Sequence, residues 1–145
     1  MKKITTAILA GIIGTAVMSA VMMIGGAMGM PKMSPPKMLS GMMRLPIAVG
    51  WVMHLIIGII FAFAYTFWGN KMLKIGNIWL KGAVFGSIVF SFAQIIMATM
   101  PMPPMAGSML PKVIAGLMGH IIFGIAIALM AGNAYCSKKS CQISQ

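Results

Sequence analysis

Four long apolar stretches constrain the fold of this chain more than any other feature. They cover about residues 4–27, 46–68, 78–99 and 111–132. A transmembrane helix needs roughly 20 predominantly apolar residues to cross about 30 Å of hydrocarbon, and each stretch has about that length. The sequence therefore predicts an all-α polytopic membrane protein with four transmembrane helices, folded as a single membrane domain over residues 1–145.

The composition agrees with a membrane protein and removes several kinds of chemistry. Hydrophobic residues make up 60% of the chain, and the mean hydropathy is +0.99. The chain contains no Asp or Glu, so it has no paired carboxylates for catalysis and no acidic ligands for Mg²⁺ or Ca²⁺. We therefore expect a non-enzymatic protein whose reactive side chains are histidines, cysteines, hydroxyls and 19 methionines.

Small residues recur at every fourth position in the apolar stretches and indicate an internal repeat. Segments 50–66 and 116–132 carry glycine, histidine, glycine and alanine in the same order, 66 residues apart. The first and third stretches share a second series at an offset of 72, Gly11, Thr15 and Ser19 against Ala83, Ser87 and Ser91. Such spacing lets helices pack closely in lipid. The pattern predicts two tandem helical hairpins, about 4–68 and 78–132, in parallel orientation about an axis along the membrane normal.

The basic residues predict how the chain is oriented in the membrane. The two sides of the predicted topology carry seven and four of them: Lys2, Lys3, Lys71, Lys74, Lys81, Lys138 and Lys139 on one, and Lys32, Lys37, Arg44 and Lys112 on the other. The positive-inside rule then places both termini of this multi-pass protein in the cytoplasm. The net charge of +11 suits anionic lipid headgroups, so we expect the lipid bilayer as a partner and no nucleic acid.

The two histidines, His54 and His120, are candidate cofactor-binding residues because the parallel repeat places them at equal depth. One interpretation is that each ring only hydrogen-bonds a neighbouring helix. Candidate partners for such bonds are Thr15, Ser19, Ser87, Ser91 and Gln94. The alternative is a shared ligand, either a metal ion or a b-type haem held by two axial imidazoles with glycines leaving room for the ring.

Methionines form the other candidate metal site. Two connectors rich in Met and Pro face the outside in this topology, and their closely spaced thioethers are Met28, Met30, Met33, Met100, Met102 and Met105. Thioethers are soft ligands that suit Cu(I) or Ag(I). Met18 and Met22 would also place two sulfur atoms on one helix face. The competing interpretation is that methionine serves as a flexible apolar filler.

The sequences MGMPKMSPPKM, GWVMH and GHIIFG resemble those of a family of small, uncharacterised bacterial inner-membrane proteins with four spans. The resemblance covers most of the chain and implies topology, with no activity to transfer. The functional hypothesis therefore depends on the candidate side chains alone. It is a non-enzymatic membrane protein that binds a soft metal through its histidines and outer methionines. The alternatives are a haem-bearing electron carrier and a structural or accessory subunit. The cofactor is thus none, haem b or Cu(I), and four spans leave homo-oligomerisation open.

Overall fold

The structure, a computed structural model, describes residues 2–31, 34–99 and 108–139, and all regular structure in these ranges is helical. Four helical stretches are long and apolar enough to cross a membrane: Lys3–Ala27, Ile47–Gly69, Ile78–Thr99 and Met109–Gly132. They belong to α1 (Lys2–Ala27), α3 (Ile47–Ala64) with its π-helical continuation (Tyr65–Gly69), α5 (Ile78–Thr99) and α6 (Met109–Lys139). The predicted all-α fold with four candidate spans is confirmed.

Two short helices complete the described chain. α4 (Asn70–Met72) lies in the turn before α5, whose first backbone N–H groups are capped by the Asn77 side chain. α2 (Pro35–Met43) lies in the connector between α1 and α3, where the density of prolines predicts no continuous helix. Pro35 and Pro36 occupy the first turn of α2, where no N–H donor is needed, so they start this helix rather than prevent it.

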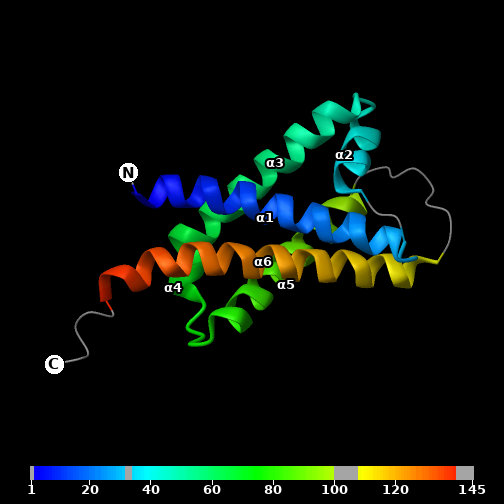
Figure 1. Cartoon of the computed structure of the whole chain (residues 1–145). Helices are drawn as coiled ribbons and strands as arrows, with labels where there is room; N and C mark the ends of the chain where they lie inside the picture. Colours follow the sequence, from blue (N-terminus) through cyan, green and yellow to red (C-terminus); the bar gives the residue numbers. More distant parts are fainter. Residues whose placement is uncertain (1, 32–33, 100–107, 140–145) are drawn as a thin grey trace.

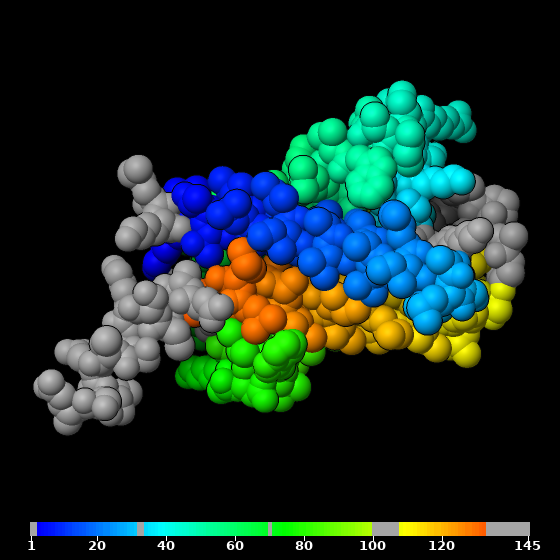
Figure 2. All heavy atoms as spheres, viewed as in Figure 1, coloured from blue at the N-terminus to red at the C-terminus, as the bar shows by residue number. Residues whose placement is uncertain are grey.

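The four long helices contact one another in the order α3, α1, α6, α5. Figure 1 shows α1 and α6 side by side along the molecule, with α2 at the end opposite the N-terminus, and Figure 2 shows these two helices covering one face. We call the two ends of the molecule the α2 end and the terminal end. α3 and its π-helical continuation each contact α5 through an aromatic pair. Phe61 of α3 pairs with Phe92 at 5.9 Å between ring centroids, and Tyr65 of the continuation pairs with Phe85 at 4.9 Å.

Glycines allow the closest approaches between helices. A Cβ atom added at Gly11 of α1 would lie 2.6 Å from the Ile59 Cα of α3. A Cβ atom added at Gly82 of α5 would lie equally close to the Ile125 Cα of α6. Backbone therefore rests on backbone at both contacts, which is how small residues stabilise helix pairs in lipid.

Gly11 and Gly82, which make these two similar contacts, lie 71 residues apart, whereas the series of small residues in the sequence has an offset of 72. Residues 11, 14, 15 and 18 of α1 are buried, as are residues 82, 85, 86 and 89 of α5. Ala83 and Ser87 are only partly buried, because α6 approaches at the glycine that precedes each of them. The closest contacts with α6 are therefore made at residues that lack a Cβ atom, and these are Gly82 and Gly86 rather than the small residues that follow them.

Candidate functional site

A cavity of about 380 Å³ lies among the helices and is lined by residues of α1, α2, α3, α5 and α6. Its walls are mostly aliphatic, aromatic and thioether side chains. Five lining residues carry a polar group, namely Thr15, His54, Gln94, Lys112 and His120. Both histidines of the chain thus line one cavity. An apolar cavity with a few convergent polar groups is the usual form of a binding site.

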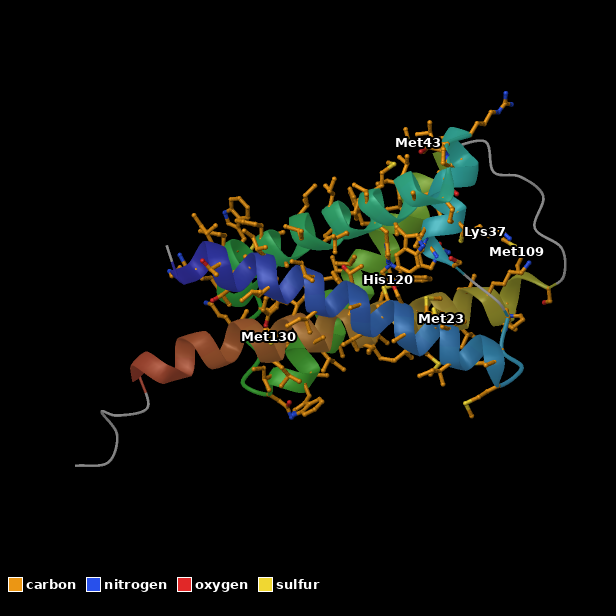
Figure 3. All side chains as sticks on the ribbon, turned by 45° about the horizontal axis from the view of Figure 1, so that its top comes forward. Met23, Lys37, Met43, Met109, His120 and Met130 are labelled. Atoms are coloured by element: carbon orange, nitrogen blue, oxygen red, sulfur yellow. The ribbon has the colours of Figure 1, made fainter. Side chains whose placement is uncertain are left out.

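His120 is held by a hydrogen bond within its own helix and by an aromatic neighbour. Its Nδ1–H donates to the Gly116 carbonyl oxygen of α6 at 2.7 Å, and its ring packs edge-on against Phe90 of α5, with 5.4 Å between centroids. Because a carbonyl can only accept, the neutral ring carries its proton on Nδ1 and presents the lone pair of Nε2. Figure 3 shows His120 in the middle of the molecule, between Met130 and the α2 end, where Lys37 and Met109 lie.

His54 has the opposite feature, a buried ring atom without a partner. Among the described residues, three buried side-chain atoms have no hydrogen-bond partner: His54 Nε2, Thr15 Oγ1 and Ser19 Oγ. Leaving such an atom unsatisfied costs about 1–3 kcal/mol, and more where no water can reach it. His54 and Thr15 both line the cavity, and neither of these two polar atoms has a partner within the described chain.

The hydrogen bonds do not follow the helix-to-helix pattern expected from the sequence. Ser87 Oγ donates to the Ala83 carbonyl at 2.9 Å, and Ser91 Oγ donates to the Ser87 carbonyl at 3.0 Å, both within α5. His120 likewise bonds its own helix. Hydroxyl groups in an apolar environment donate to the carbonyl one turn earlier in the same helix. Ser87 and Ser91 were candidate hydrogen-bond partners of the histidines, and both bond to their own helix instead.

The outer methionines are only partly within the described chain. Met33, Met100, Met102 and Met105 lie outside the described residues. Met28 is 81% exposed, and Met30 packs its methyl group against Gly25 beside a separate small cavity of about 20 Å³. The structure therefore does not bring Met28 and Met30 to the histidines.

A different set of five methionines lines the histidine cavity: Met18, Met22, Met38, Met97 and Met109. The spacing of Met18 and Met22 is visible in the sequence, and both approach Gly119, the residue before His120. Met38, Met97 and Met109 come from three separate helices, so no local spacing marks them. Within the described residues no three His, Cys, Asp or Glu side chains come together, so a metal ion here would need thioether ligands beside imidazole.

Comparison with known families places the chain in one of them. The family described as "Family of unknown function (DUF6789)" matches residues 1–140. The chain belongs to this family. No curated protein and no solved structure matches the chain. The DUF6789 assignment confirms membership in a family of unknown function, while the bacterial origin implied by the resemblance stays a prediction. The cavity, rather than the family, must support a function for this DUF6789 protein.

Proposed function

We propose that this DUF6789 protein is a non-enzymatic integral membrane protein that binds one soft monovalent metal ion, Cu(I) or Ag(I), in its cavity. His54 and His120 would be the principal ligands. The supporting observation is that both histidines line one cavity. The Nε2 atom of His54 has no hydrogen-bond partner, and the bond from His120 Nδ1 to the Gly116 carbonyl leaves the Nε2 lone pair of His120 available. A metal-bound histidine commonly donates its other N–H to a carbonyl, as His120 does to Gly116.

The kind of metal follows from the charge of the ligands. Neutral imidazoles and the thioethers of Met18 and Met22 add no charge, and the chain has no Asp or Glu side chain to balance an ion. A buried charge in lipid is costly unless it is balanced, so a monovalent ion suits this site better than a divalent one. Soft nitrogen and sulfur ligands favour Cu(I) and Ag(I) over hard cations.

A b-type haem is the second candidate, favoured by the same histidine pair and by the apolar walls around it. Haem would make the protein an electron carrier, with His54 and His120 as axial ligands. A structural or accessory subunit would need neither ligand. These three functions predict different contents of the purified protein.

Metal content and an absorption spectrum test the proposal directly. We expect protein purified in detergent with Cu(I) or Ag(I) to hold about one ion per chain, because one cavity contains both histidines. Removing the ion with a strong Cu(I) chelator should lower the thermal midpoint, since a ligand at about 100 times its Kd stabilises the folded state by about 2.7 kcal/mol. Stoichiometric iron with a Soret band would instead favour haem, and protein with neither would favour an accessory role.

The orientation in the membrane is part of the proposal and rests on the division of the basic residues, seven against four. We place the chain in a bacterial plasma membrane with both termini cytoplasmic and the α2 end outside. A reporter fused after Lys139 should then behave as cytoplasmic, and one inserted near Lys37 as extracytoplasmic. The reverse result at both positions would contradict the orientation.

The two hairpins, α1 with α3 and α5 with α6, are inferred to be tandem repeats in this topology. The inference is supported by the matching contacts of Gly11 with Ile59 and of Gly82 with Ile125. Homo-oligomerisation is a further prediction, and the mass of the protein in a detergent micelle would test it.

A further inference from the structure

We infer that Met38, Met97 and Met109 form a loading site at the mouth of the cavity, where Cu(I) or Ag(I) binds before it passes inward to the histidine pair. This inference rests on the proposed function. It adds a second place of binding and a direction of transfer, neither of which follows from a histidine site alone.

The three methionines lie at the α2 end of the cavity, on three different helices. Met109 is the first residue of α6, and His120 lies 11 residues further along, or about 16 Å deeper at 1.5 Å per residue. Met97 is two residues from the end of α5, and Met38 belongs to α2 itself. All three line the cavity, and we call this part of it the mouth. Figure 3 shows Met109 toward the α2 end and His120 further inside.

Two further thioethers continue the series inward. Met18 lies nine residues before the end of α1, about 13 Å from the α2 end, which is close to the depth of His120. Met22 lies one turn nearer to the mouth. The exposure of these side chains falls along the same path, from 60% at Met109, through partly buried Met38, Met97 and Met22, to 2% at Met18. Sulfur ligands therefore run from the surface to the level of the histidines.

Thioethers suit the first step because they bind Cu(I) and Ag(I) without losing a proton and without adding charge. Transfer inward is a ligand exchange, in which a bond from the metal to a mouth sulfur breaks as a bond to Met22, Met18 or an imidazole Nε2 forms. The oxidation state of the metal does not change, and no proton or electron is released. No co-reactant is needed.

The charge at the mouth explains why sulfur ligands would be required there. Lys112 also lines the cavity, and the described chain has no acidic side chain to attract a cation. Simple electrostatics therefore opposes the approach of a metal ion at this end. Soft coordination by thioethers is the attraction that the mouth does offer.

The test compares loading rates of two triple variants. In M38L/M97L/M109L the sulfur atoms are removed while apolar volume is nearly kept. We expect Cu(I) transfer from a coloured chelator to this variant to be about tenfold slower than to the wild type, with about one ion per chain still bound at the end point. The matched control is M23L/M72L/M118L, which changes three exposed methionines that do not line the cavity and should load at the wild-type rate.

Each outcome decides the inference. Equal rates in the two triple variants would overturn the loading site while leaving the histidine site intact. Loss of the bound ion from M38L/M97L/M109L would also overturn it, because the mouth would then be part of the final site. A wild-type protein that takes up no Cu(I) would overturn the proposed function and the loading site together.

A single variant serves if circular dichroism shows that the triple variant does not fold. Met109→Leu alone, at an exposed position, should still slow loading about threefold.

Discussion

Replacing Gly124 with leucine is expected to lower the thermal midpoint of the protein in detergent by about 10 °C or more, because it forces α5 and α6 apart. A Cβ atom at Gly124 would meet the Gly82 carbonyl oxygen and would lie 2.8 Å from the Gly86 Cα. Both neighbours are backbone atoms of α5, which cannot turn aside as a flexible side chain can. Thermal unfolding followed by circular dichroism measures the loss.

The control for this substitution is Gly41→Leu in α2. A Cβ atom at Gly41 has no neighbour within 4 Å, so the same change should shift the midpoint by only about 1–2 °C. Gly69 would be a poorer control, because a Cβ atom there would lie 3.2 Å from the Tyr65 ring. Equal losses at Gly41 and Gly124 would show that the glycine matters for something other than the contact between α5 and α6.

Gly58→Leu is expected to give a smaller loss than Gly124→Leu. A Cβ atom at Gly58 would first meet the Thr15 hydroxyl, which is a side-chain atom and can rotate away. Part of the strain is thereby relieved before α1 and α3 must separate. A loss at Gly58 that exceeds the loss at Gly124 would contradict this order, and the same unfolding measurement decides it.

The spans could be predicted closely because apolar length is a local property of the sequence. The predicted stretch 46–68 corresponds to the span Ile47–Gly69 in the structure, and the predicted stretch 111–132 corresponds to Met109–Gly132. The sequence did not predict α2 because a cluster of prolines usually breaks a helix. Prolines in the first turn of a helix do not break it, so their effect depends on where the helix begins. Pro35 and Pro36 stand in the first turn, and this position becomes evident only once the helix boundary is known.

The register between the hairpins could not be predicted from side-chain size. Gly11, Thr15 and Ser19 match Ala83, Ser87 and Ser91 well as small residues. The contact with α6, however, selects Gly82 and Gly86. A serine or an alanine still carries a Cβ atom, and the presence or absence of that atom decides how closely two backbones approach. The partner helix determines which small residue is used, and a single sequence does not reveal the partner.

Some residues of the candidate site could be identified from the sequence, and others could not. His54 and His120 stood out because the chain has only two histidines, in matching surroundings, and the structure places both on one cavity. Met38, Met97 and Met109 could not be selected from 19 methionines, because only the packing of α2, α5 and α6 brings them to one wall. Local spacing could reveal only Met18 and Met22, which share a helix face.

His54→Ala and His120→Ala are each expected to weaken Cu(I) or Ag(I) binding by about 100-fold or more, because each removes one of two principal ligands. The double variant should lose little beyond either single variant, since residues that act on one site are not additive. Competition with a Cu(I) chelator measures the affinities. Retained stoichiometric binding in either single variant would eliminate the shared site.

The metal-free protein should respond to the same two substitutions unequally, and this separates a shared site from two structural hydrogen bonds. His120→Ala removes the bond to the Gly116 carbonyl and should lower the free energy of unfolding by about 1 kcal/mol. His54→Ala removes a buried Nε2 that has no partner, so its cost in free energy of unfolding should be smaller or even reversed in sign.

A purely structural role for both histidines predicts a different result. Each substitution would then cost the stability of one hydrogen bond, and the two losses would add in the double variant. Equal and additive losses without any bound metal would therefore contradict the shared site. Unequal losses in the metal-free protein, together with equal losses of binding, are the result that a ligand held between the two rings requires.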